Sequence, residues 1–139
     1  MERCPCCNAR LRNPSQCQRC HSDLSLAATA TESANHFLMQ GIAHWQAGAI
    51  AQSLLALHQS IRLKDSSVGQ VLFNRLLQDY WQQILDLLRE NQTLKAKQAL
   101  YSIRPLISHS PLLSALNECV DFRLIYPKIE EKPQKNQDK

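Results

Sequence analysis

The stretch ANHFLMQGIAHWQAGAIAQSLLALHQSIRLKD, residues 34–65, decides the fold class of this chain. Large apolar side chains recur along it at three- and four-residue steps. They are Phe37, Leu38, Ile42 and Trp45 in the first half, and Ile50, Leu54, Leu57 and Ile61 in the second. Each series places an apolar stripe on one side of a helix. Because only Ala47 and Gly48 interrupt the pattern, the two helices must pack antiparallel as a hairpin.

The helical pattern continues after this hairpin. A third helix is expected over residues 67–89, with Ser67 as its cap, and a fourth over 93–103, with Thr93 as its cap. Pro105 ends the fourth helix, because proline disfavours helical backbone in the residue before it.

A short closing helix is expected over residues 111–122, where Ser110 offers a cap and Pro111 takes the first helical position. The chain has 139 residues and only three glycines, a composition that also favours helix. We therefore predict a mainly α fold, with about five helices in residues 34–122.

The hairpin of residues 34–65 resembles a tetratricopeptide repeat (TPR). The resemblance rests on small residues at helix contacts, a turn glycine and one large apolar residue, namely Gly41, Ser53, Ser60, Gly48 and Leu57. Residues 61–65 resemble the closing Ala-Leu-x-Leu-x-Pro of the repeat, with Asp65 for Pro, and His44 stands where Tyr is usual. Residues 81–100 look like a second, poorer copy. The resemblance implies an array of helical hairpins with an extended concave surface that binds other proteins.

The first twenty-four residues form a separate unit with metal-ligand spacing. Cys4 and Cys7 make one Cys-x-x-Cys pair, and Cys17 and Cys20 make a second one nine residues later. Two such turns complete a tetrahedral shell of four thiolates, which suits Zn²⁺. We predict one structural Zn²⁺ held by these four cysteines. The same thiolates bind iron in rubredoxin-like sites, but those sites usually lie in a larger aromatic-lined fold, and residues 1–24 contain no aromatic residue.

The same segment resembles the short N-terminal zinc ribbons of many bacterial proteins. Their pattern is Cys-Pro-x-Cys-x₃-Leu, a short loop, and Cys-x-x-Cys-Gly-x₂-Leu. The matching positions are Cys4, Pro5, Cys7, Leu11, Cys17, Cys20 and Leu24. His21 replaces the usual Gly, at a position that often needs positive φ. Two alternatives for the ligand set are Cys6 in place of Cys7, and His21 as an additional donor.

These units divide the chain into four parts. They are a zinc ribbon at 1–24, a linker or frayed helix start at 25–33, the TPR-like helical domain at 34–122, and a polar tail at 123–139. The linker is expected because residues 25–33 contain few large apolar groups. The tail is rich in Lys, Glu, Gln and Asn, so we expect it to remain disordered.

Charge and cysteine content suggest the compartment. Met1 is followed by charge and cysteine rather than by an apolar leader, no apolar run approaches the length of a membrane span, and six cysteines without a secretion signal point to metal binding in a reducing compartment. We expect a cytoplasmic protein. The net charge is +4, and Arg3, Arg10, Arg12 and Arg19 surround the cysteines. They either offset the thiolate charge or form a patch for nucleic acid.

Catalytic patterns are scarce, so we do not expect an enzyme or a small-molecule substrate. No Gly-rich phosphate loop or Ser–His–Asp arrangement can be identified, and Cys119 is expected to be a buried, inert thiol.

Trp45 and Trp81 are expected in the core, although either could line a groove. The first hypothesis is a non-catalytic interaction adaptor or assembly factor in a larger complex, binding a protein partner near His44, Trp45 and His58. The alternatives are a nucleic-acid-associated zinc ribbon and a metal-handling or redox-active protein that uses Cys6.

Overall fold

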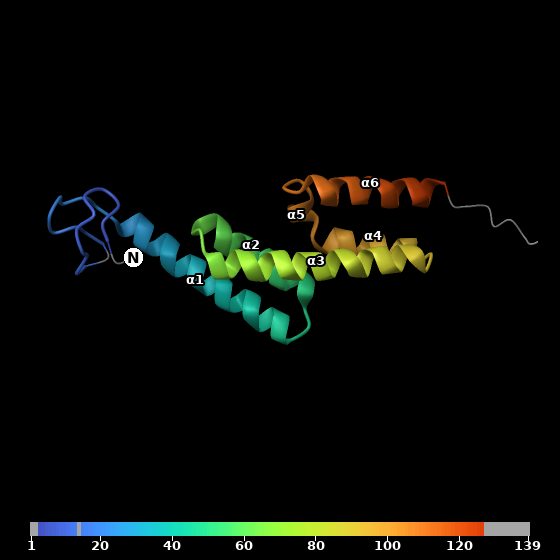
Figure 1. The fold of residues 1–139 in the computed structure, drawn as a ribbon, viewed down its shortest axis with the longest axis horizontal. Coiled ribbons are helices and arrows are strands. Elements are labelled where there is room, and N and C mark those ends of the chain that lie inside the picture. Colours follow the sequence, from blue (N-terminus) through green and yellow to red (C-terminus); the bar gives the residue numbers. More distant parts are fainter. Residues whose placement is uncertain (1–2, 14, 127–139) are drawn as a thin grey trace, which may run out of the picture.

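A computed structural model describes residues 3–13 and 15–126 of the chain, so that residues 127–139 of the tail predicted at 123–139 lie outside this range. The mainly α prediction is confirmed. The six helices are α1 (Ser25–Gln46), α2 (Ile50–Leu63), α3 (Ser67–Arg89), α4 (Thr93–Ser102), α5 (Arg104–Ile107) and α6 (Pro111–Ile125) (Figure 1). The short α5 explains why the expected number was about five. Two isolated antiparallel bridges in the cysteine segment are the nearest approach to β-structure among the described residues.

The α1–α2 hairpin is packed through small residues, as the sequence predicts. The Ser53 hydroxyl donates to the Gly41 carbonyl oxygen at 2.7 Å, and the Ser60 hydroxyl donates to the Ala34 carbonyl oxygen at 2.7 Å. A Cβ placed on Gly41 would lie only 2.7 Å from Cγ of Leu57. The two helices therefore approach closely enough that α1 tolerates no side chain at position 41 without rearrangement.

Of the two interpretations of residues 25–33, the helix start rather than the linker agrees with the structure, because these residues form the first turns of α1. Two groups of the cysteine segment fix the start of this helix. The Asp23 carboxylate accepts a hydrogen bond from the Ser25 backbone N–H at 2.9 Å, and Leu24 is buried against Cys4 and Cys17. Residues 27–31, Ala-Ala-Thr-Ala-Thr, have the alanines that sustain helix without tertiary packing. The cysteine segment is thus joined to the hairpin by continuous helix, at the opposite end of the molecule from α6 (Figure 1).

The core of the helical domain is formed by α2, α3, α4 and α6. Its fully buried side chains include Leu54, Leu57, Leu76, Ile84, Leu100, Ile103, Leu113 and Val120. Trp81 is half-buried against this cluster, whereas Trp45 is 47% exposed, so the core expectation fails for Trp45. The Tyr80 hydroxyl donates to the Ala99 carbonyl oxygen at 2.9 Å and ties α3 to α4.

The helix caps agree with the sequence at one of three places. Ser110 caps α6, since its side chain accepts from the Leu113 N–H. Ser66 rather than Ser67 caps α3, because the extended backbone at Ser66 lets its hydroxyl reach the Gly69 N–H. Thr93 is the first residue of α4 and not its cap.

The C-terminal helix also departs from expectation. It runs to Ile125, three residues beyond the predicted boundary, and the Arg123 guanidinium donates to the Leu88 carbonyl oxygen at 2.8 Å. Cys119 is exposed rather than buried, because α6 turns Leu113, Leu116 and Val120 toward the core and leaves position 119 outside that face.

Candidate metal centre and apolar groove

The four cysteines lie on two turns with the same backbone geometry. In the first turn, the Asn8 N–H donates to the Cys4 carbonyl oxygen at 2.9 Å, and in the second the His21 N–H donates to the Cys17 carbonyl oxygen at 2.9 Å. Asn8 has φ of 56° and His21 has φ of 57°. The expected positive φ at His21 is therefore confirmed, and Asn8 occupies the equivalent position. Asparagine and histidine adopt this left-handed backbone more readily than most residues.

The geometry of the thiols fits a tetrahedral metal ion. The Sγ atoms of Cys4, Cys7, Cys17 and Cys20 all lie within 4.8 Å of one another. The Cys4–Cys20 and Cys7–Cys17 Sγ pairs are each separated by 3.6 Å. In a regular tetrahedron with metal–sulfur bonds of about 2.3 Å, the sulfurs would be about 3.8 Å apart. These four cysteines can therefore hold a metal ion.

The pKa values of two of the four thiols are shifted in opposite directions. The Ser22 hydroxyl and then the Ser22 backbone N–H lower the pKa of Cys20 to about 6. The Ala9 backbone N–H lowers the pKa of Cys7, but desolvation and hydrogen bonds from the other three thiols outweigh it and raise this pKa to about 12. Protons are thus shared unequally within the cluster. A bound cation would displace them, since thiolates are the metal-binding form.

The two alternative ligands lie outside this cluster. Cys6 and His21 are exposed, and neither belongs to the group of close donor atoms formed by the four cysteines. Arg3, Arg10, Arg12 and Arg19 are all exposed around the centre. None of them takes part in an ion pair among the described residues, so their charge is available to an acidic partner.

A second candidate site consists of two depressions that share Ser67. One, of about 190 Å³, lies beside the α2–α3 turn, and its lining is mainly polar, with Leu38 of α1 among its few apolar residues. The other, of about 460 Å³, is apolar and is lined by α3 alone, through Val68, Val71, Leu72 and Arg75 besides Ser67. Val68 and Val71 are 62% and 71% exposed. We call the two depressions together the α1–α3 groove, and its apolar part is the one on α3.

The structure places the predicted partner-binding residues at different points around the hairpin. Trp45 lies seven residues after Leu38, which is two helical turns further along the same flank of α1. His44 is exposed but points about 100° away from Trp45 around the helix. The hydrogen bonds from Ser53 to Gly41 and from Ser60 to Ala34 fix how α1 and α2 lie alongside each other. In this arrangement His58 lies about 12 Å further along α2 than the point that is level with His44.

His58 lies instead at the junction of α2, α3 and the α5–α6 turn. Its ring centroid is 6.0 Å from that of Phe73 and 5.0 Å from that of His109. Burial lowers the pKa of His58, and the charges of His109 and Arg62 lower it further. This environment favours the neutral imidazole, which is typical of a residue that packs between elements.

We expect His58 to make stability depend on pH. The pKa of His58 in the folded state lies below the ordinary value of about 6.5. The stability that neutral His58 contributes is therefore present above that pH and is lost as the pH falls through the folded-state pKa. The free energy of unfolding in urea should therefore fall between about pH 7 and about pH 5, and His58→Gln should reduce that fall. NMR titration of the His58 ring measures the pKa directly; a value above about 6.5 would contradict this account.

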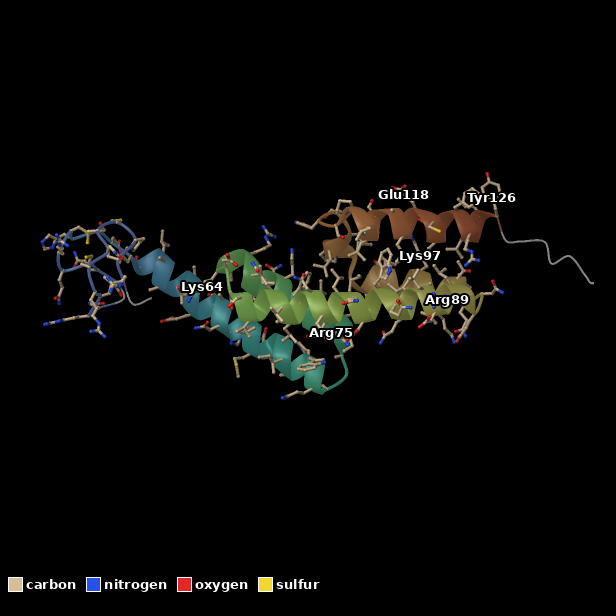
Figure 2. The ribbon with its side chains drawn as sticks, viewed as in Figure 1. Lys64, Arg75, Arg89, Lys97, Glu118 and Tyr126 are labelled. Atoms are coloured by element: carbon tan, nitrogen blue, oxygen red, sulfur yellow. The ribbon has the colours of Figure 1, made fainter. Side chains whose placement is uncertain are left out.

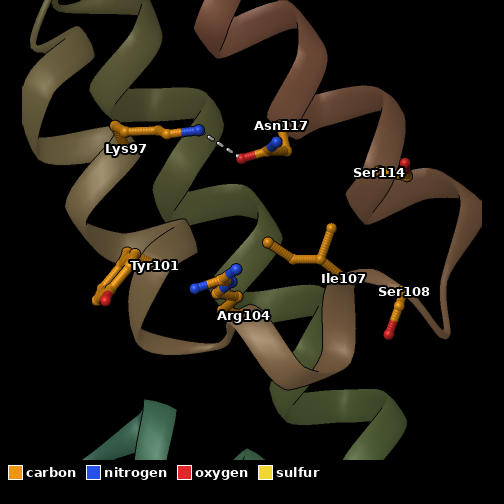
Figure 3. A pocket seen from close by; sticks show the side chains of 7 residues that line it. All are labelled: Lys97, Tyr101, Arg104, Ile107, Ser108, Ser114 and Asn117. Carbon is orange, nitrogen blue, oxygen red and sulfur yellow. Dashed lines mark hydrogen bonds between the residues drawn. The ribbon is translucent and has the colours of Figure 1, made fainter.

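An open cleft of about 530 Å³ lies between α4, α5 and α6 (Figure 3). Its polar lining includes Lys97, Arg104 and Asn117. Lys97 Nζ lies 2.6 Å from Asp121 Oδ1 and donates to Asn117 Oδ1 at 2.9 Å. This pairing neutralises Lys97 and joins α4 to α6, so the charge that the cleft presents is that of Arg104.

Comparisons with family models, with curated protein sequences and with solved structures found no match to this chain. The metal centre and the groove are therefore interpreted from their own geometry. In the described part of the chain, no helix combines the length and apolar character needed to cross a bilayer.

Proposed function

We propose that this protein is a zinc-binding, non-catalytic adaptor or assembly factor that holds a protein partner within a larger cytoplasmic complex. The observation that carries the proposal is the apolar part of the α1–α3 groove, where Val68 and Val71 remain exposed on α3, together with the half-exposed Trp45 on α1. Tryptophan is enriched among the residues that dominate binding energy at protein interfaces. Exposed contiguous apolar surface in a folded domain is characteristic of an interaction site.

Zinc is the metal that we propose for the four-cysteine centre. A closed tetrahedral set of four thiolates is typical of structural zinc, which has no redox chemistry and no open coordination position. With four deprotonated ligands the centre carries a charge of −2, and the exposed arginines around it offset that charge. In this proposal the metal folds the segment that anchors α1, and the helical domain binds the partner.

The chemistry of the groove indicates the kind of partner. Val71 and Leu72 give it an apolar lining, and Arg75 beside them is paired with Asp79 at 3.3 Å. We propose that it takes an apolar segment of another protein. Trp45 would extend the contact along α1, and His44 would lie at the rim.

The test is site-specific capture of the partner in the native host. A photo-reactive amino acid at position 71 should cross-link one defined protein, whereas the same group at exposed Gln98 on α4 should not. Val71→Glu and Trp45→Ala should each weaken capture about tenfold or more, because an interface anchor contributes about 2 kcal/mol or more. His44→Glu should cause a smaller loss. Helical circular dichroism should remain unchanged in all three variants, since these side chains are exposed.

Two results would contradict the adaptor proposal. One is capture that survives both Val71→Glu and Trp45→Ala. The other is capture that persists when only residues 1–33 are present, which would move the contact to the cysteine segment.

A nucleic-acid-associated zinc module is the second candidate, supported by the four exposed arginines. In that case, binding to nucleic acid would weaken steeply as salt rises, by the counterion-release relation. Replacing Arg10 and Arg12 with Gln would reduce that slope by about two phosphate contacts, whereas Val71→Glu would have no effect.

A further inference from the structure

Helix α6 is apolar on two faces rather than one. Its inner face, with Leu113, Leu116 and Val120, is buried in the core. Its outer face carries a second apolar series, Leu112, Ala115, Cys119 and Phe122, which Tyr126 continues at the C-cap; we call these five residues the outer stripe. All five are exposed, and Leu112, Phe122 and Tyr126 are 69%, 62% and 63% exposed.

The spacing of the outer stripe is that of a helix-pairing seam. Its members follow one another at steps of three, four, three and four residues, which is the a/d pattern of a coiled coil. A helix with two apolar faces can pack against a neighbour on each, and among the described residues only the inner face of α6 is covered.

The outer stripe is open to another molecule. Figure 2 shows Glu118 and Tyr126 projecting from the edge of α6 opposite to α4. The helix is already held by its inner face, so a partner would meet an ordered surface and need not order it on binding. The remaining residues of this chain are poorly suited to cover the stripe. Residues 127–139 contain only one large apolar residue, Ile129.

The charges that flank the stripe indicate its occupant. Glu118 and Arg123 lie on opposite sides of the seam, five residues apart, at the g and e positions that pair between parallel helices. Around a two-fold axis parallel to α6, Glu118 of one copy faces Arg123 of the second copy. In an antiparallel arrangement, Glu118 of one copy would instead lie opposite Glu118 of the second copy, and the two charges would repel each other. The Arg123 guanidinium donates one bond to Leu88 and keeps further N–H groups for this contact.

We propose that the outer stripe is the surface on which two copies of this chain pair, with their α6 helices parallel around a two-fold axis. The pairing is independent of the adaptor function, because the outer stripe lies on α6 (Figure 1) and shares no residue with the α1–α3 groove. It would give the complex two metal-binding segments and two α1–α3 grooves.

The first experiment measures the mass of the full-length, zinc-loaded protein by sedimentation equilibrium across the micromolar range. We expect a monomer–dimer equilibrium with the mass of two chains at the upper end. Phe122→Glu should weaken self-association at least tenfold, and Leu112→Glu serves as a second variant. Met39→Glu on α1 is the matched control, since Met39 is 65% exposed and lies outside the stripe. Circular dichroism establishes that each variant remains folded.

The second experiment tests the parallel arrangement. The protein carries Cys6→Ser and Cys119→Ser, which remove the two exposed thiols outside the four-cysteine cluster, and Leu112→Cys, which places one thiol at the end of the stripe. A short bis-maleimide should then join two copies through position 112 if the helices are parallel, whereas in an antiparallel pair position 112 of one copy lies beside the far end of the stripe of the other. A protein that is monomeric throughout would overturn the proposal, as would a dimer that is unaffected by Phe122→Glu and Leu112→Glu. A dimer that these variants disrupt, but in which the Leu112→Cys thiols do not cross-link, would overturn the parallel arrangement.

Discussion

Removing the metal is expected to unfold residues 3–24 while the helical domain stays folded. The apolar filling of this segment is limited to buried Leu24, with Ala9 and Leu11 packed against it. Structural zinc supplies about 10–16 kcal/mol of apparent binding energy in comparable peptides, which is far more than this filling can replace. In Cys17→Ser, NMR resonances of residues 3–24 should collapse to unfolded positions, and those of the α2–α4 core should persist.

The matched control for Cys17→Ser is Cys6→Ser. Both substitutions replace a thiol in the same segment, but Cys6 is exposed and lies outside the cluster of close sulfurs. Cys6→Ser should therefore keep both the metal and the folded spectrum. If Cys6→Ser lost the metal as Cys17→Ser does, the ligand set assigned here would be wrong.

Adding one methyl group at position 41 is expected to destabilise the helical domain. In Gly41→Ala, the new Cβ would lie 2.7 Å from Cγ of Leu57, a fully buried side chain. Overpacking of this kind costs about 1–3 kcal/mol. The greater helix preference of Ala offsets up to about 1 kcal/mol of that cost. Urea unfolding followed by circular dichroism should show a net loss of stability.

The control for this prediction is the same substitution at Gly69. A Cβ there would lie 3.4 Å from Ile61, so Gly69→Ala should be neutral or stabilise by up to about 1 kcal/mol. Leu57→Ala in the Gly41→Ala background tests the cause, because it vacates the space that the new methyl needs. The two substitutions should be less destabilising together than their separate effects add up to. Strict additivity would show that positions 41 and 57 do not interfere.

The helical fold could be predicted because its information is local. The apolar period gives the helices, and the small residues at 41, 53 and 60 mark where α1 and α2 touch. The linker prediction failed because the start of α1 is fixed from outside the helix, by Asp23 and Leu24 of the cysteine segment. A stretch without large apolar residues can be helical when its end is anchored in this way.

The metal centre could be predicted closely because Cys-x-x-Cys spacing determines local geometry. The grouping of four sulfurs and the positive φ at His21 were both accessible from sequence. The groove was not. Val68 and Val71 share the apolar period of α3 with core residues, and only the tertiary arrangement shows that these two stay exposed. Cys119 was misplaced for the same reason, since α6 has two apolar faces and periodicity alone does not say which one is buried.

The most direct test of the central claim is the metal content and coordination of the purified full-length protein. Native mass spectrometry with elemental analysis should give one zinc per chain, and X-ray absorption should show four sulfur neighbours at about 2.3 Å. Cys17→Ser should abolish this signal. A protein that carries no zinc after expression in zinc-replete medium, or whose metal is iron, would contradict the account, as would a coordination shell containing a histidine nitrogen.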